Sequence, residues 1–363
     1  MSDVTPPFDV SPLVKVSNNI IRLEDAVTTS DPKDKMKQRA ATAELRRFVP
    51  LQLAFWPEDR RAIANELARC ALFSCRDTRK PRQYFDNSPL FMLGEGAITY
   101  RGEELRTQDE DIFISLAHMA REMPGGKMLV TVSSSDICKM NGWRQDQRYY
   151  DAIFLSIQRL KAGVITVFSR RLAKAIKCQR ALDAGAAESE LAKLYDELQQ
   201  IETEALKEPL YTENGAELAG MMLSLISGEP IFSGGKSLKN NIPQGNLTWE
   251  ISLDKNLVSL FAKPYLTLVD MHARGQLSAT GKRLQSYFGS HKHPYPVKLR
   301  SLEKMLGLSF GEESALKFAI NQQLEELKRL KVISRFEFHR SASEREWLVT
   351  VIRSDSDESA QND

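Results

Sequence analysis

The sequence predicts an α+β protein in which two tandem winged helix-turn-helix domains follow a disordered N-terminal leader. The first supporting observation is an internal repeat, a feature that sets the architecture of a whole chain. Two related pairs of segments recur about 165 residues apart: Ile137–Gly142 with Leu160–Ile165, and Leu302–Gly307 with Leu327–Ile333. The second observation is the order of elements. Each copy predicts a short helix, a Gly-containing turn, a longer amphipathic helix and a β-strand.

Residues 1–44 form the expected leader. They contain Pro6-Pro7 and no sustained apolar periodicity, so we expect disorder and short partner-binding motifs. The whole chain has 363 residues and is 42% hydrophobic, which suits two or three domains with real cores. Just after the leader, Ala62–Phe73 is expected to be a helix, and Phe91–Leu93 and Ala97–Tyr100 are expected to be strands.

The N-terminal winged-helix domain is expected at residues 45–256, with an acidic helical insertion at about 169–246. Ser133 and Asp136 have the spacing of a capping box that opens a short helix. Around this cap we expect a helix, a strand, a longer helix and two wing strands, at Asp109–Met123, Met128–Val132, 144–160, Val164–Phe168 and Leu247–Leu253.

The C-terminal winged-helix domain is expected at residues 257–353, before an acidic tail at 354–363. Ser309 and Glu312 repeat the capping-box spacing ahead of the long helix. The expected elements are three helices at Ser278–Gly289, Val297–Leu306 and 312–330, and two wing strands at Lys331–Phe338 and Glu346–Ile352.

The charge distribution favours a nucleic-acid partner, although the net charge is only +2. Residues 257–353 hold seven more basic than acidic residues, whereas residues 181–217 hold eight more acidic than basic ones. Basic charge concentrated on one module is typical of a surface that contacts phosphates. The C-terminal domain is therefore expected to be the main DNA anchor.

Several other classes of protein are not supported by the sequence. No apolar stretch approaches the length of a membrane span, and the N-terminus has no signal-peptide pattern. The four cysteines lack paired spacing, which suits thiols in a reducing cytoplasm, and no metal or cofactor site is expected. Gly234-Gly235-Lys236-Ser237 lacks the upstream glycine of a phosphate-binding loop, and no nucleophile–base pair indicates an enzyme.

The long helices carry the residues expected to contact DNA. A helix fits the major groove, where Arg pairs with guanine and Asn or Gln pairs with adenine. The candidates for base contacts are Arg144, Gln147, Arg148 and Asp151 in the first domain, and Ser314, Lys317 and Asn321 in the second. The candidates for phosphate contacts are Lys282, Arg283, Lys298, Arg300, Arg335 and Arg340.

Long ordered runs in the chain resemble the TrfA family of plasmid replication initiators. These runs are Arg47–Ile63, Ala71–Phe73 with Arg82, Ile98–Leu105 and Thr107–Asp111, and the resemblance continues over residues 45–350. It implies a protein that binds tandem origin repeats (iterons) on double-stranded DNA and opens an adjacent AT-rich region. It also implies recruitment of the host initiator, replicative helicase and sliding clamp, and an equilibrium between monomer and dimer.

A short motif at Gln52-Leu53-Ala54-Phe55 resembles the peptide with which bacterial proteins bind the sliding clamp. Gln52, Leu53 and Phe55 would be its anchors, although Phe55-Trp56 stands where Leu-Phe is commoner. The alternative is a strand that packs on its own domain. For the whole chain, the alternatives are a winged-helix transcriptional repressor and an adaptor that uses winged helices for protein contacts.

Overall fold

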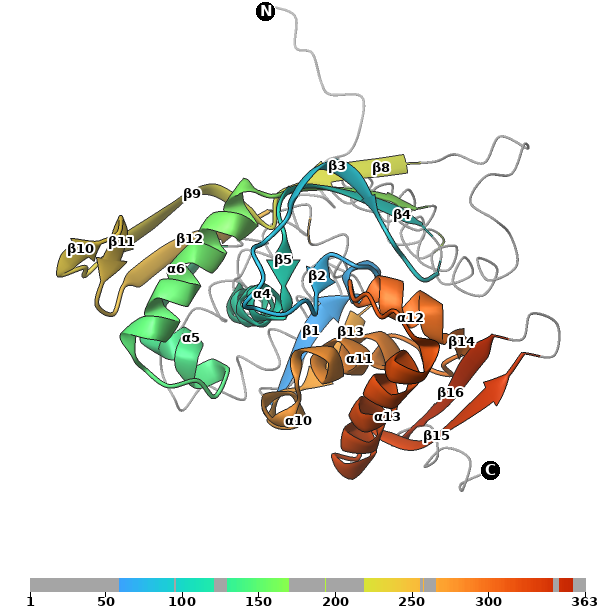
Figure 1. Ribbon diagram of the computed structural model, residues 1–363. Coiled ribbons are helices and arrows are strands. Elements are labelled where there is room, and N and C mark those ends of the chain that lie inside the picture. The colour runs from blue at the N-terminus through green and yellow to red at the C-terminus, as the bar shows by residue number, and fades with distance from the viewer. Residues whose placement is uncertain are drawn as a thin grey trace, which may run out of the picture.

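The computed structural model describes residues 59–94, 96–120, 129–169, 219–254, 266–341 and 346–354, together with Lys193 and Leu257. These residues form a mixture of helices and strands (Figure 1). The described strands belong to several small sheets, and all but one of their pairings are antiparallel.

The first described residues are extended, so the helix expected at Ala62–Phe73 is wrong over most of its length. Ala62, Ile63 and Ala64 are completely buried in an antiparallel ribbon of β1 (Arg60–Ala64) and β13 (Leu266–Asp270). Pairing with a strand about 200 residues further along the chain holds this segment extended, and local periodicity does not encode such a partner. Three short elements follow: α3 (Asn65–Ala68), β2 (Phe73–Ser74) and its parallel partner β5 (Leu105–Arg106).

The N-terminal unit contains a helix, a strand, two helices and two further strands, with additional short strands inserted before and between those last two. Its three strands pair in the order β6-β12-β9. The Ser133 hydroxyl oxygen accepts a bond from the Asp136 N–H at 3.1 Å, which confirms the predicted cap. The elements are α4 (Thr107–Ala120), β6 (Leu129–Ser133), α5 (Ser134–Met140), α6 (Gln147–Ala162), β9 (Ile226–Ser233) and β12 (Thr248–Leu253).

The strand expected as the first wing strand belongs to another sheet. β7 (Val164–Ser169) pairs with β4 (Ala97–Glu103) and β8 (Ala219–Leu223), and β3 (Tyr84–Leu90) completes the order β3-β4-β7-β8. Gly163 permits this path, because a Cβ at that position would lie 2.6 Å from the Tyr100 hydroxyl. The expected strand Leu247–Leu253 is present as β12, which pairs with β9. We call the segment from β9 to β12 the wing, after the role expected for it.

The C-terminal unit repeats the same order of elements, and its strands pair as β14-β16-β15. The long helix begins at Glu313, with Glu312 as N-cap and no side-chain cap bond, so the capping box expected at Ser309 is wrong. The elements are α11 (Ala279–Gly289), β14 (Val297–Lys298), α12 (Leu299–Met305), α13 (Glu313–Arg329), β15 (Ile333–Arg340) and β16 (Trp347–Arg353).

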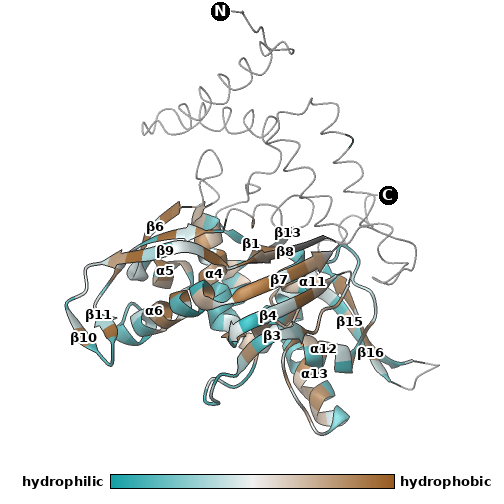
Figure 2. Cartoon of the chain, turned by 90° about the horizontal axis from the view of Figure 1, so that it is seen from above, coloured by the Kyte–Doolittle hydropathy of each residue, from teal (hydrophilic) through white to brown (hydrophobic). Residues whose placement is uncertain are grey.

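Two clusters of buried apolar side chains support the two units. One includes Phe113, Ile157 and Trp249, and the other includes Leu302 and Leu324. In Figure 2, α6 and α13 each carry hydrophobic and hydrophilic residues, as expected for helices that pack on one face. The clusters interlock across residue 256, since Val269 belongs to the first and Cys75 to the second.

Candidate nucleic-acid interface

The start of α6 presents two exposed arginines. Asp146 caps the helix, because its side chain accepts a hydrogen bond from the Tyr149 N–H at 3.2 Å. One face of α6 is buried through Ile153 and Ile157. Arg144 and Arg148, both expected to contact DNA, lie exposed at the capped end.

Gln147 and Asp151, two further predicted base contacts, instead connect α6 to the wing. The Gln147 amide nitrogen donates to Asp151 Oδ1 at 2.6 Å, and the Gln147 amide oxygen accepts from the Gly245 N–H at 2.9 Å. Gln244 Nε2 also reaches Asp151 Oδ1 at 3.4 Å. These two polar side chains therefore hold the tip of the wing against the helix.

The wing tip adds residues that the sequence reasoning missed. Between β9 and β12, a small hairpin of β10 (Ser237–Lys239) and β11 (Ile242–Gln244) projects beside α6 (Figure 1). Its turn is Asn240-Asn241, with φ of 51° and 62°, as in a type I′ hairpin. Lys236 and Lys239 are exposed on it. The paired asparagines are a hairpin signal that would have located this tip from the sequence.

The wing tip also exposes an apolar side chain among polar ones. Leu238 is 73% exposed, and it pairs with Pro243 across the hairpin. Residues 231–249 contain no Asp or Glu. The tip is therefore a basic and amide-rich projection that contacts α6 at Gln147, and such a surface attracts polyanions.

The second long helix, α13, places its predicted contacts differently. Ser314 is exposed and Asn321 is partly buried. The Lys317 ammonium lies 3.3 Å from the centre of the Trp347 ring and 5.3 Å from that of Phe338. Lys317 is therefore held against the strands β15 and β16 by a cation–π contact.

Four predicted phosphate contacts of the C-terminal unit lie at or near the surface, and all have partners there. Lys298 pairs with Glu346 at 2.9 Å, and Arg300 pairs with Glu303 at 2.8 Å. The exposed Arg335 lies 3.5 Å from Glu337. The Arg340 guanidinium stacks 5.1 Å from the Trp347 ring centre. The three ion pairs reduce the positive charge that the unit presents to a ligand.

The remaining two predicted phosphate contacts are corrected by the structure. Arg283 is fully buried, where it pairs with Glu110 at 2.6 Å and donates to the carbonyls of Leu67, Ala68 and Cys70. The Lys282 ammonium is 2.6 Å from Asp111 Oδ2. The sequence predicted both side chains to be at the surface, because adjacent basic residues usually form the exposed edge of a helix. Their acidic partners, however, lie far away in the sequence.

The acidic run Asp109-Glu110-Asp111 is buried near the start of α4. Asp109 and Glu110 lie in the first turn, where the helix dipole favours carboxylates. Asp109 pairs with Arg82 at 2.7 Å and with Arg159 at 2.9 Å. These contacts fix α6 and the segment before β3 to one point on α4.

Glu110 and Asp111 reach into the C-terminal half of the chain. Arg274 lies 3.0 Å from Glu110 and 2.7 Å from Asp111. Although burial opposes its charge, the carboxylates of Asp111 and Glu110 raise the pKa of Arg274 above its usual value. Together with Lys282 and Arg283, these groups form a buried ion network that joins the two units, which we call the junction network.

The predicted clamp-binding residues Gln52, Leu53 and Phe55 lie outside the described residues. In the described part of the chain, no cluster of three metal-ligating side chains occurs. No helix among those residues is both long and apolar enough to cross a membrane.

A family model described as TrfA protein matches residues 24–199 and 244–335, which is more than half of the chain. The chain belongs to the TrfA family. This confirms the resemblance found in the sequence and extends it into the expected leader, from residue 45 back to residue 24. Residues 200–243 are not matched, and they lie within the insertion expected at about 169–246.

One relative in the TrfA family is the plasmid replication initiator protein TrfA of Escherichia coli. The two chains are 25% identical over 294 residues, which cover 80% of this chain and 62% of that relative. The chain thus matches less than two thirds of the relative's length.

Two solved structures of domains 2 and 3 of RctB are also similar to this TrfA-family chain. One, from a selenomethionine derivative, has a TM-score of 0.49 at 12% identity and covers 80% of this chain and 98% of its own. The other has a TM-score of 0.46 at 14% identity and covers 80% and 97%.

Proposed function

We propose that this TrfA-family protein is a plasmid replication initiator that binds iteron repeats through two winged helix-turn-helix domains. The repeated element order supports both domains: α4, β6, α5, α6, β9 and β12 correspond to α11, β14, α12, α13, β15 and β16. In both sheets the first strand pairs with the last one. By analogy with known winged helices, α6 and α13 are the recognition helices. The domains extend over residues 45–256 and 257–353.

The observation that carries the proposal is the surface at the capped end of α6. Arg144 and Arg148 are exposed at the start of α6, and Lys236 and Lys239 are exposed on the wing tip that Gln147 contacts at Gly245. The tip segment, residues 231–249, contains no acidic residue. The bonds from Gln147 to Asp151 and Gly245 fix the helix and the tip relative to each other. A prearranged helix end and wing suit one DNA segment, with the helix in the major groove and the wing on the backbone.

The N-terminal domain is a stronger DNA anchor in this proposal than the charge count suggested. Arg274, Lys282 and Arg283 account for three basic residues of the C-terminal half, yet they neutralise Glu110 and Asp111 inside the protein. Ser314, Lys317, Asn321, Arg335 and Arg340 remain the proposed contacts of the second domain. Lys317 would act from its position on Trp347.

The proposed function as an initiator includes more than binding to duplex DNA. A protein of this class opens an AT-rich region next to the repeats and recruits host replication proteins, without itself catalysing a reaction or requiring a cofactor. The name of the Escherichia coli relative supports this proposal. A transcriptional repressor with the same domains would protect the DNA without opening it, so opening decides between the two functions.

The deciding experiment uses the full chain with its own plasmid origin. We expect protection of tandem repeats in footprinting, reactivity of an adjacent AT-rich strand to permanganate, and a steep fall of log affinity with log salt. Arg144→Ala with Arg148→Ala should weaken binding about tenfold to hundredfold. The matched control is Arg79→Ala, because Arg79 is 89% exposed and lies outside this surface. Protection without opening would favour a repressor, and no protected repeat would refute iteron binding.

A host sliding clamp is the proposed partner of the segment containing Gln52, Leu53 and Phe55. Gln52→Ala with Phe55→Ala should abolish capture of the purified clamp while leaving origin binding intact. Equal capture by the double variant and by the unchanged protein would remove this partner from the proposal.

A further inference from the structure

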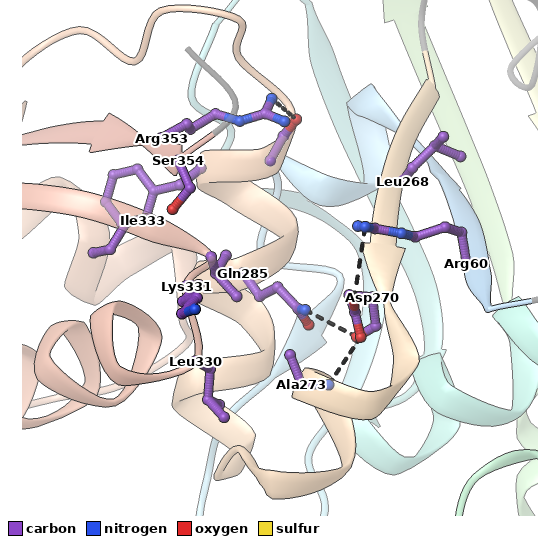
Figure 3. Close-up of a pocket in the computed structure, with 13 residues that line it drawn as sticks. Arg60, Leu268, Asp270, Ala273, Gln285, Leu330, Lys331, Ile333, Arg353 and Ser354 are labelled. Atoms are coloured by element: carbon purple, nitrogen blue, oxygen red, sulfur yellow. Dashed lines mark hydrogen bonds and ion pairs between the residues drawn. The ribbon is translucent and has the colours of Figure 1, made fainter. Parts of the chain in front are cut away.

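A cavity of about 240 Å³ lies where the two proposed domains meet. Its lining includes no residue from the N-terminal turn of α6 or of α13. One wall comes from Arg60 and Asp270 of the β1–β13 ribbon, and another comes from Gln285 of α11. The opposite wall is the segment after α13, including Lys331, with Arg353 from the end of β16. Figure 3 shows Arg60 and Lys331 on opposite sides, with Gln285 and Asp270 between them.

The cavity lining is rich in positive charge. Arg60, Lys331 and Arg353 oppose a single carboxylate, that of Asp270. That carboxylate already caps α10 (Met271–Gln276), because it accepts the Ala273 N–H at 2.9 Å. Arg60 lies 3.7 Å from it, a long and weak ion pair. Arg353 is anchored at the wall by bonds to the Gly289 and His291 carbonyls.

Lys331 has a backbone conformation that is unusual for a residue other than Gly. Its φ is 57°, in the left-handed region. It follows α13 at the position where a helix normally ends with Gly or Asn, and its N–H bonds to the Lys328 carbonyl while that of Val332 bonds to Leu327. A non-Gly residue held in this region is strained, and such strain concentrates at functional positions.

The cavity also borders an unsatisfied acceptor. Gln285 is 3% exposed, and its amide nitrogen donates to the Asp270 carbonyl at 3.1 Å. Its amide oxygen is buried without a hydrogen-bond partner among the described residues. A buried polar atom of this kind is normally satisfied by a neighbour, a water or a ligand.

We propose that this cavity binds a phosphate group, with Lys331 and Arg60 as its charge partners and Gln285 as acceptor for a donor on the same ligand. Two cations on facing walls suit an anion between them, and the volume admits a small phosphorylated molecule. The same chemistry would hold a phosphate of bound DNA. Only that second source depends on the proposed function.

The test compares the full chain with Lys331→Asn. Asn accepts the left-handed conformation, so this variant should fold at least as stably while losing the charge. Lys328→Gln is the matched control, because Lys328 is exposed on α13 and does not line the cavity. Melting temperatures are measured against inorganic phosphate and pyrophosphate at constant ionic strength, and duplex affinity is measured against salt.

Binding of a free phosphate should raise the melting temperature of the unchanged chain and of Lys328→Gln, with affinity about tenfold lower in Lys331→Asn. If DNA is the source, neither anion has an effect, and Lys331→Asn alone reduces the salt slope for duplex binding by about one. The proposal is overturned if Lys331→Asn matches the control in both assays. If the chain bound phosphate but did not bind the origin, the proposed function would be refuted and the phosphate site would still hold.

Discussion

The environment of His291, which lies just after the C-cap of α11, disfavours the protonated form of its side chain. Burial and the nearby charges of Arg69 and Arg353 lower the pKa of His291 from 6.5 to about 4, against a smaller opposing effect of the Tyr287 carbonyl. The ring lies 3.1 Å from that carbonyl through Nδ1, which donates to it as the neutral tautomer. At neutral pH His291 is therefore uncharged.

The lowered pKa of His291 predicts a loss of stability in mild acid. Between pH 6.5 and about 4 the unfolded chain binds a proton that the folded chain does not. The free energy of unfolding should therefore fall as the pH falls through this window, by up to about 1.4 kcal/mol per pH unit from this group. Urea unfolding of His291→Gln should lack that contribution.

The control for this prediction is His272→Gln, because His272 is exposed on α10. Its pH profile should follow that of the unchanged chain. If His291→Gln showed the same profile as His272→Gln, His291 would not be responsible for the acid sensitivity.

The buried cysteines show a second effect of residue environment. Burial raises the pKa of Cys70 to about 11 and that of Cys75 to about 12. Cys70, Cys75 and Cys138 are free thiols. Both Cys70 and Cys75 therefore stay protonated at neutral pH, and a protonated thiol is a poor nucleophile.

At the scale of elements, α6 and the β10–β11 hairpin act as one structure because of Gln147. This residue bonds to Asp151 on its own helix and to the backbone of Gly245 on the hairpin. The sequence predicted base contacts for Gln147 and Asp151 from their helical spacing, and both are partly buried in the structure. It could not show that the same side faces a hairpin almost a hundred residues further on.

Gln147→Ala should release the wing tip without unfolding the domain. Loss of its two bonds should cost about 1–2 kcal/mol of local stability, and amide exchange of residues 236–245 should accelerate. Gln158→Ala is the matched control, because Gln158 is exposed on the same helix. Mass spectrometry of hydrogen exchange measures both variants.

DNA binding adds a second measurement to this comparison. We expect Gln147→Ala to weaken duplex binding while leaving the salt slope unchanged, because no charge is removed. Unchanged exchange at the wing tip would contradict the structural role of Gln147.

On the scale of the whole molecule, the junction network joins the two units through charges that are taken out of water. Glu110 is completely buried between Arg274 and Arg283, at 3.0 and 2.6 Å. Removing one member of such a group leaves its partners buried and uncompensated. The network therefore favours one fixed arrangement of the two units.

Glu110→Gln should lower the free energy of unfolding by about 3–5 kcal/mol, because two buried guanidinium groups lose a carboxylate. Glu326→Gln, which breaks an exposed pair with Arg329, should cost less than about 1 kcal/mol. Chemical denaturation of the two variants gives the comparison. Equal losses would show that the junction network does not stabilise the folded chain.

Local patterns in the sequence predicted much of the fold. The long helices were expected at 144–160 and 312–330, and they occur at Gln147–Ala162 and Glu313–Arg329. Three local signals made this possible: the apolar periodicity, the Ser133 cap and the strand alternation of Leu247–Leu253. Each depends on residues only a few positions apart, so each can be predicted from the sequence. The pairing of β7 was missed because a β-branched run specifies a strand but not its neighbour.

The sequence by itself determined the family and the positions of the long helices, since both depend on ordered local patterns. Only the tertiary structure decided which charges can face a ligand. Arg148 and Arg283 are equally basic in the sequence, yet the first is exposed and the second is buried against Glu110, 173 residues away. The physical reason is that an ion pair depends on the approach of distant chain segments, whereas helices and caps depend on neighbours.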